Sequence, residues 1–220
     1  MKVILFGGTG MVGQGVLLEC LREPNVERVL SIGRTPLGRG DPKLTEIVQP
    51  DVADLAPVAD RLDGYDACFF CLGVSSTGMS EADYRRLTYD LTLSVARLLA
   101  ERNPDMTFVY VSGQGTDSSE RGRFMWARVK GATENALLAL PLRTYLFRPG
   151  FIQPAPGVTP KVAMYARIYR LVRPITPLLL RLFPRFTTTS EAVGRAMIAV
   201  AGHGHPRRVL ENRDLNTFTP

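Results

Sequence analysis

The feature that most constrains the fold of this chain is a glycine-rich loop near its N-terminus. In VILFGGTGMVGQG, the glycines Gly7, Gly10 and Gly13 recur at every third position after an apolar run, and Gly8 adds the alternative spacing G-x-G-x-x-G. Such a loop ends a buried strand and opens a helix, because the first glycine permits a tight turn and the last lets the helix pack closely. The N–H groups and positive dipole end of that helix bind phosphate. The loop therefore predicts a Rossmann-type unit that binds a dinucleotide.

The rest of the chain continues this alternation of strand and helix. Apolar runs predict strands, and helical periodicity between them predicts helices. The predicted strands are Val3–Phe6, Arg28–Ile32, Glu46–Val48, Ala67–Leu72, Thr107–Ser112, Thr144–Phe147 and a short one near Val209–Leu210. The clearest predicted helices are Met11–Arg22, Ala82–Glu101 and Phe124–Leu138. The pattern predicts an α/β fold with a doubly wound parallel sheet and helices on both faces.

The length of 220 residues fits one large domain with a single core. We expect residues 1–150 to form the cofactor-binding core and residues 151–220 a small helical segment on the substrate side. Ser80 and Thr188 each precede an acid by three residues, which is the spacing of a helix-opening capping box. No signal-peptide pattern and no apolar run long enough to span a bilayer is present. We therefore expect a cytoplasmic protein.

The net charge of +6 belongs to one segment, residues 161–185, which contains no acid. Its basic residues are Lys161, Arg167, Arg170, Arg173, Arg181 and Arg185. Without these 6, the 27 basic residues fall to 21 and balance the 21 acids. With no DNA-binding motif, this distribution argues against a nucleic-acid partner. The segment is open to three interpretations: the solvated face of a lid, a basic amphipathic surface for anionic lipid or a partner protein, or arginines that bind an anionic substrate. A homodimer is a further open expectation.

The end of the second predicted strand selects between cofactors. An acid at this point would bond the adenosine ribose 2′-hydroxyl of NAD. The sequence LSIGRTP has Arg34 there and no acid. A guanidinium favours the 2′-phosphate of NADP, unless Arg34 is a solvated loop residue. We therefore expect NADP(H) to be favoured over NAD(H).

Two cysteines form a C-x-x-C pair within DACFFCLG, which raises a redox or metal alternative. On a strand, however, residues three apart such as Cys68 and Cys71 point to opposite faces. No second Cys or His pair accompanies them. We predict buried structural thiols and no metal site.

Taken together, these motifs resemble the short-chain dehydrogenase/reductase superfamily, in its atypical, NAD-dependent epimerase/dehydratase-like branch. The segment WARVKGATENAL is most similar to the Tat-interacting oxidoreductase-like subgroup. By this resemblance, QPDVADL is expected to supply adenine contacts and CLGVSS to lie near the cofactor ribose. FRPGFIQP is expected to contain a turn that contacts the nicotinamide amide. The implied cofactor-binding residues are Gly7, Thr9, Gly10, Met11, Val12, Gly13, Asp51, Val52, Leu72, Gly73, Val74, Lys130, Pro149 and Gly150.

The resemblance also implies a catalytic set, in which one residue departs from the family. Ser112 stands at the place of the catalytic serine, and Lys130 matches the lysine that holds the nicotinamide ribose. Four residues before Lys130, on the same helix face, Trp126 replaces the family's tyrosine. An indole N–H donates a hydrogen bond but releases no proton at physiological pH. The alternative is that Trp126 is only a wall aromatic and Lys130 a surface lysine.

The missing tyrosine leaves the function open between two classes. The first hypothesis is an NAD(P)-binding oxidoreductase or epimerase-like enzyme. Its proton would come from another hydroxyl, that of Ser112, Thr116 or Tyr89, or its substrate would need no protein acid. The second is a catalytically weak regulatory or scaffold protein that senses the NADP(H) state. The histidines His203 and His205 lie in a turn-like stretch near the C-terminus and are not expected to be catalytic.

Overall fold

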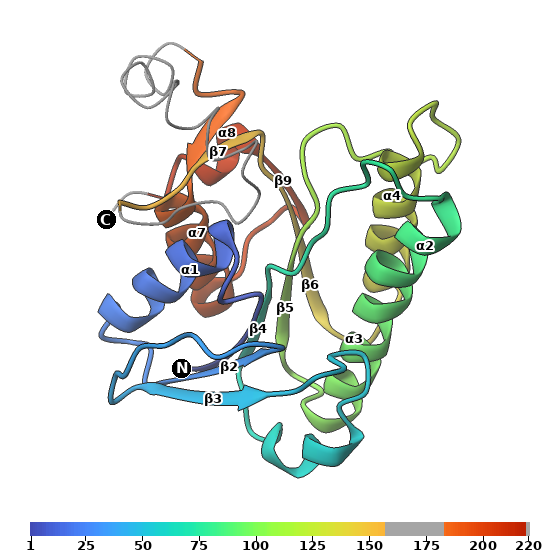
Figure 1. Cartoon of the computed structure of the whole chain (residues 1–220). Coiled ribbons are helices and arrows are strands. Elements are labelled where there is room, and N and C mark those ends of the chain that lie inside the picture. Colours follow the sequence, from blue (N-terminus) through green and yellow to red (C-terminus); the bar gives the residue numbers. More distant parts are fainter. Residues whose placement is uncertain (157–182, 219–220) are drawn as a thin grey trace.

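The computed structural model describes residues 1–156 and 183–218 (Figure 1). Within them, the main sheet has seven parallel strands in the order β3-β2-β1-β4-β5-β6-β9. The strands are β1 Lys2–Phe6, β2 Arg28–Gly33, β3 Leu44–Val48, β4 Ala67–Phe70, β5 Thr107–Val111, β6 Arg143–Arg148 and β9 Val209–Glu211. The chain begins in the middle of the sheet, winds to one edge through β3, and then to the other. The predicted doubly wound α/β fold is confirmed.

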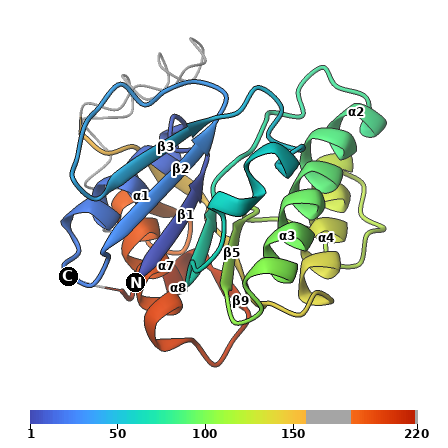
Figure 2. The ribbon, with the colours of Figure 1, turned by 90° about the horizontal axis from the view of Figure 1, so that it is seen from below.

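Helices cover both faces of this sheet (Figures 1 and 2). On one face lie α1 (Met11–Arg22) and α7 (Ser190–His203), and on the other lie α2 (Glu81–Arg85), α3 (Leu91–Arg102) and α4 (Met125–Leu138). A 3-10 helix, η1 (Ala56–Arg61), follows β3, and the short helix α8 (Asn212–Leu215) follows β9. This arrangement leaves the carboxyl ends of the strands at one edge, where the loops that carry the predicted site begin.

Side chains of each strand alternate between two apolar clusters, one on each face. On β1, Ile4 packs with α3 and α4, whereas Leu5 packs with α1 and α7. The two cysteines follow the same rule, because Cys68 belongs to the first cluster and Cys71 contacts the second. Both are free, and burial raises the pKa of the Cys71 thiol to about 12. These are the properties of structural thiols rather than of a redox pair.

Some predicted boundaries differ from those in the structure. The strands β4 and β5 end at Phe70 and Val111, before the predicted Leu72 and Ser112, because the chain leaves the sheet there to form the loops of the carboxyl edge. The single helix predicted for Ala82–Glu101 is α2 and α3 joined by a π-helical turn, η2 (Arg86–Asp90).

The two predicted helix caps have different outcomes. Ser80 caps α2, since its Oγ accepts a hydrogen bond from the backbone N of Asp83 at 3.1 Å. The prediction for Thr188 is wrong by one residue. Thr189 caps α7 by accepting from Ala192 N at 3.0 Å, whereas the buried Thr188 hydroxyl donates to Asn216.

The C-terminal region, expected to form a segment on the substrate side, also contributes side chains to the apolar core. Sequence reasoning missed a second, two-stranded parallel sheet formed by β7 (Phe151–Gln153) and β8 (Thr187–Thr189). Helix α7 packs on α1, and β9 extends the main sheet beside β6. Of the basic segment, residues 161–182 lie outside the described part, so the three interpretations of its arginines stay predictions. Among the described helices, none has the length and apolar character of a membrane span.

Replacing Gly15 by Ala should destabilise the contact between α1 and α7. The new Cβ would lie 2.2 Å from Oγ of the fully buried Ser190. Overpacking of this kind costs roughly 1–3 kcal/mol, of which the better helix propensity of Ala offsets about 1 kcal/mol. Gly202→Ala on α7 is the matched control, because its Cβ would meet nothing within 4 Å in the described structure. In urea unfolding, the midpoint concentration should be lower for Gly15→Ala and unchanged or higher for Gly202→Ala. Equal midpoints for the two variants would contradict the close contact between α1 and α7.

Candidate functional site

The glycine loop joins β1 to α1 at the carboxyl edge of the sheet, and two of its glycines are required by close contacts. Gly7 has a φ of +83°, and a Cβ on it would lie 2.7 Å from the carbonyl carbon of Cys71. A Cβ on Gly13 would lie 2.1 Å from the carbonyl oxygen of Gly7. Only glycine fits at either position. The first turn of α1 is thereby held directly against the loop and the chain that follows β4.

Gly10 has a different role, because the fold constrains it less tightly than Gly7 or Gly13. It is the N-cap residue of α1, with an ordinary φ of −83°, and a Cβ on it would meet only the Gly7 carbonyl oxygen at 3.1 Å. No side chain caps this helix, and its first turn holds no acid. The N–H groups of Met11, Val12 and Gly13 have no partner within the helix. The site is therefore open to an anion that approaches the Gly10 backbone.

A cavity of about 350 Å³, here called the inner cavity, opens beside the glycine loop. It brings together five residues predicted from distant parts of the sequence. These are Gly7, Thr9, Arg34, Val52 and Leu72, and the other lining residues are Gly8, Ser31, Ile32, Gly33 and Thr35. Leu72 N lies 2.9 Å from the position of a Gly7 Cβ, so the chain after β4 closes one side. The loops that follow four neighbouring strands, β1 to β4, thus converge on one cavity.

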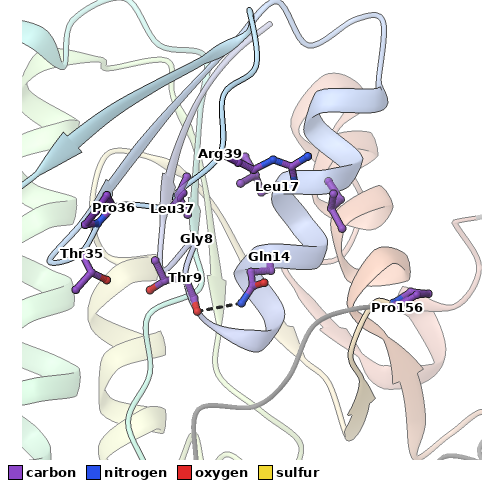
Figure 3. Close-up of a pocket in the computed structure, with 10 residues that line it drawn as sticks. Gly8, Thr9, Gln14, Leu17, Thr35, Pro36, Leu37, Arg39 and Pro156 are labelled. Carbon is purple, nitrogen blue, oxygen red and sulfur yellow. Dashed lines mark hydrogen bonds between the residues drawn. The ribbon is translucent and has the colours of Figure 1, made fainter.

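A second cavity of about 440 Å³, the outer cavity, lies between α1 and the loop after β2 (Figure 3). The two cavities share Gly8, Thr9 and Thr35. Gln14 fixes the floor by donating to the Thr9 carbonyl at 3.1 Å, and Glu46 anchors the loop by accepting from Leu37 N at 2.8 Å. Figure 3 shows the remaining lining residues, which include Leu17, Pro36, Arg39 and Pro156.

Sequence reasoning missed Arg39, which lines the outer cavity as Arg34 lines the inner one. In Figure 3 its side chain extends over α1 near Leu17. Both arginines are exposed, and neither has a hydrogen bond or ion pair with any part of 1–156 or 183–218. The signal in the sequence was a second arginine in RTPLGR, but only the folded loop places it at the outer cavity.

Other predicted cofactor residues lie outside both sets of lining residues. The Asp51 carboxylate accepts from Ala53 N at 2.9 Å and so caps its own turn. Gly73 and Val74 are exposed in the loop after β4. The assignment of these three residues to cofactor contacts stays a prediction.

The predicted catalytic half of the site forms where β5, α4 and the turn after β6 meet. Lys130 on α4 donates from Nζ to the carbonyl oxygen of Ser112. A Cβ on Gly113 would lie 3.9 Å from that Nζ and 4.0 Å from the carbonyl oxygen of Pro149. Gly150 N donates to Asn212 Oδ1 at 2.7 Å, which fixes the turn. The structure therefore brings Ser112, Lys130, Pro149 and Gly150 together.

Trp126 lies one helical turn before Lys130 and packs against the loop after β5. Its indole ring would come within 3.3 Å of a Cβ on Gly115. The ring is half-buried, and the exposed Phe124 precedes α4 close by in the sequence. Trp126 thus packs on the loop after β5, and its role in the tyrosine's place stays a prediction.

The Ser112 hydroxyl faces the interior rather than this space. Ser112 is buried, and its Oγ donates to Glu134 Oε1 at 2.6 Å, with the Phe147 carbonyl at 3.1 Å. Glu134 is 1% exposed and forms a two-point ion pair with Arg148, which reaches both carboxylate oxygens. Burial lowers the pKa of Lys130 to about 8, and the Glu134 charge opposes that shift in part. Sequence reasoning missed Glu134 and Arg148.

No family model matches the chain, but individual proteins do. The mitochondrial protein fmp52 of Emericella nidulans is 33% identical over 159 residues, which are 69% of this chain and 66% of that protein. The match thus spans slightly less than two thirds of the relative's length.

Solved structures match over nearly the whole chain. A short-chain dehydrogenase/reductase from Saccharomyces cerevisiae superposes with a TM-score of 0.70 at 12% identity and covers 100% of this chain and 99% of its own. The Bordetella bronchiseptica enzyme WbmF, in complex with NAD+, gives a TM-score of 0.67 at 18% identity, over 98% of this chain and 76% of that one. This chain therefore has the fold of the short-chain dehydrogenases/reductases. The predicted resemblance to the superfamily is confirmed, while the Tat-interacting subgroup stays a prediction.

The expected cytoplasmic location is contradicted. The Emericella relative and further relatives of the same name from Aspergillus species are called mitochondrial proteins. The expectation rested on the absence of targeting and membrane patterns, and such an absence carries no positive information about location.

Proposed function

We propose that this protein binds NADP(H) and acts as an oxidoreductase or epimerase-like enzyme on a small-molecule substrate. The observation that carries the proposal is the convergence of Gly7, Arg34, Val52 and Leu72 on the inner cavity, beside the uncapped N-terminus of α1. WbmF, of similar fold, was solved with NAD+, which supports a nicotinamide cofactor. When bound, such a cofactor supplies hydride transfer.

The residues present fit the cofactor along its length. The glycine loop and the first N–H groups of α1 would hold the pyrophosphate. The apolar side chains of Val52 and Leu72, which line the inner cavity, would contact the adenine. Lys130, Pro149 and Gly150 lie at the opposite end of the site and would bind the nicotinamide ribose and amide.

The preference for NADP is proposed from Arg34 and Arg39, which have no partner among the described residues. Arg34 and Arg39 lie on either side of Thr35, with no acid among the lining residues of either cavity. A phosphate there would gain charge-assisted hydrogen bonds, whereas a bare 2′-hydroxyl would leave both guanidinium groups without an acceptor.

A regulatory or scaffold protein that senses the NADP(H) state is the second candidate. Trp126 favours it, because the usual proton donor is absent from the place where the family has it. A homodimer and a contact of segment 161–185 with an anionic membrane surface or a partner protein are proposals for either function. No nucleic-acid partner is proposed.

Calorimetric titration tests the cofactor preference. NADPH should bind more tightly than NADH by roughly 1.5–3 kcal/mol, the range of a charge-assisted hydrogen bond. Arg34→Ala should remove most of this difference, and Arg39→Ala should reduce it. Arg28→Ala is the matched control, because that exposed arginine lies at the opposite end of β2. Equal affinities of the unaltered protein for the two cofactors would refute the preference.

Gly10→Val tests the glycine loop itself. Its backbone conformation suits any residue, so the variant should keep its fold while the side chain blocks the approach of the pyrophosphate. We expect unfolding in urea close to that of the unaltered protein and a loss of NADPH binding. Gly40→Val is the control, since Gly40 lies in the loop before β3 with no contact within 4 Å in the described structure. Undiminished NADPH affinity in a folded Gly10→Val protein would show that the loop binds something else.

Trp126→Tyr separates the two candidate functions. It places a hydroxyl one turn before Lys130, so any slow carbonyl reduction should rise by up to about 100-fold, the lower end of the effect of a general acid. Trp126→Phe is the control: it keeps an aromatic wall without a hydroxyl and should leave the NADPH affinity and the rate nearly unchanged. An equal rate in both variants, with NADPH bound, would favour the regulatory function.

A further inference from the structure

The proposed enzyme lacks a tyrosine, and the structure shows how the other candidate hydroxyls are used. The Ser112 hydroxyl donates into the interior, to Glu134. The Thr116 hydroxyl is buried and donates to the Gly113 carbonyl at 2.8 Å. Tyr89 lies on η2, under the Arg85 guanidinium, where it lines a separate depression with α3 residues such as Ser94. His205 contacts Arg207 in its own turn. None of these groups meets Trp126 among the contacts of the described residues.

Among the described residues, Lys130 is the remaining group with a transferable proton at this place. Its ammonium is half-buried and held by a backbone carbonyl, beside Gly113 and the Pro149 turn. Within the described ranges it forms no ion pair at 4.0 Å or less. A buried ammonium without a counter-ion loses its proton more readily than an exposed one.

The reason for this missing counter-ion is the pairing of Glu134. This carboxylate lies one turn after Lys130 on α4, which puts it on the same helix face and within the spacing of an ion pair. Instead, Oε1 accepts from Ser112 Oγ at 2.6 Å and from Arg148 Nε at 3.0 Å, and Oε2 accepts from Arg148 Nη2. Arg148 thus neutralises Glu134, and the Glu134–Ser112 hydrogen bond fixes the residue whose carbonyl holds Lys130.

We propose that the Lys130 amine is the proton donor of the reaction and that Glu134 and Arg148 are the positioning residues that hold it in that role. This inference rests on the proposed oxidoreductase function. In carbonyl reduction, the Lys130 ammonium would give a proton from Nζ to the substrate oxygen, and the nicotinamide cofactor, when bound, would supply the hydride for the carbonyl carbon. The C=O π bond becomes a C–H and an O–H bond, and the neutral amine regains a proton from solvent.

The surroundings support this assignment. Burial lowers the pKa of Lys130 to about 8, within the range that suits a lysine acid or base near neutral pH. Burial also raises the pKa of Tyr84 and of Tyr110, so both stay neutral. Among the described residues, three further charged groups near α4 have partners other than Lys130. Glu211 pairs with Arg148, Arg128 pairs with Glu81, and Asp117 accepts from N–H and hydroxyl donors of its own loop.

Competitive acetylation tests the proposal on the protein without cofactor or substrate. The acetylation of each lysine is measured by mass spectrometry from about pH 6 to about pH 11. The chain has four lysines, and the exposed Lys2 is the internal reference. Lys130 should titrate near pH 8, well below Lys2. Glu134→Gln should shift its titration to still lower pH, because a negative charge is lost. Arg148→Met should shift it upward, because Glu134 becomes free to pair with Lys130, and Arg148→Lys should restore it in part.

Two outcomes would overturn the proposal. In the first, Lys130 and Lys2 are acetylated with the same pH dependence. In the second, Glu134→Gln folds and the pH dependence of Lys130 acetylation is unchanged, which would leave Glu134 a purely structural role. If Arg148→Met does not fold, the Lys130 titrations of Glu134→Gln and Arg148→Lys still test the proposal. NADPH titration by calorimetry separates this result from the proposed function. Binding of NADPH with an ordinary Lys130 titration refutes only the proton donor, whereas absence of binding refutes the cofactor proposal itself.

Discussion

The close approach of α1 to the glycine loop is the constraint on which the rest of the site depends. Because Gly13 has no side chain, the first turn of α1 rests on the Gly7 carbonyl, where a Cβ would lie only 2.1 Å away. The same helix carries Gly15 against Ser190 of α7, so the N-terminal and C-terminal regions meet on one face of the sheet. A helix held this close presents its free N–H groups at the sheet edge. Both cavities open beside that point.

The second half of the site depends on a buried ion pair instead of on glycine packing. Glu134 and Arg148 come from α4 and β6, and Ser112 comes from the end of β5. Their hydrogen bonds join the three elements beneath Lys130. A buried charge pair is retained at a cost in desolvation, so its presence favours a role beyond stability. Because Arg148 pairs with Glu134, Lys130 has no counter-ion among the described residues, and burial lowers its pKa to about 8.

Sequence and structure agree where a local pattern has one physical interpretation. Met11–Arg22 was predicted to the residue, because a glycine loop and apolar periodicity mark both its ends. The opposite faces of Cys68 and Cys71 followed from strand geometry. Agreement failed where neighbours were equivalent in sequence: TTTS gives no local reason to choose Thr189 over Thr188 as the cap. The short strands β7 and β8 were missed because three residues carry too little periodicity to be recognised.

The sequence by itself determined the doubly wound fold and the place of the glycine loop, because both depend on spacing along the chain and on the alternation of apolar residues. Val52 and Leu72 of the inner cavity followed only from the family resemblance. Only the tertiary structure decided which groups the residues of the site meet. It placed Arg39 at the outer cavity and turned the Ser112 hydroxyl toward Glu134. It also paired the Glu134 carboxylate with Arg148 rather than with Lys130. The choice of partner is made between elements distant in the sequence, because a buried charge takes the partner that packing brings within reach.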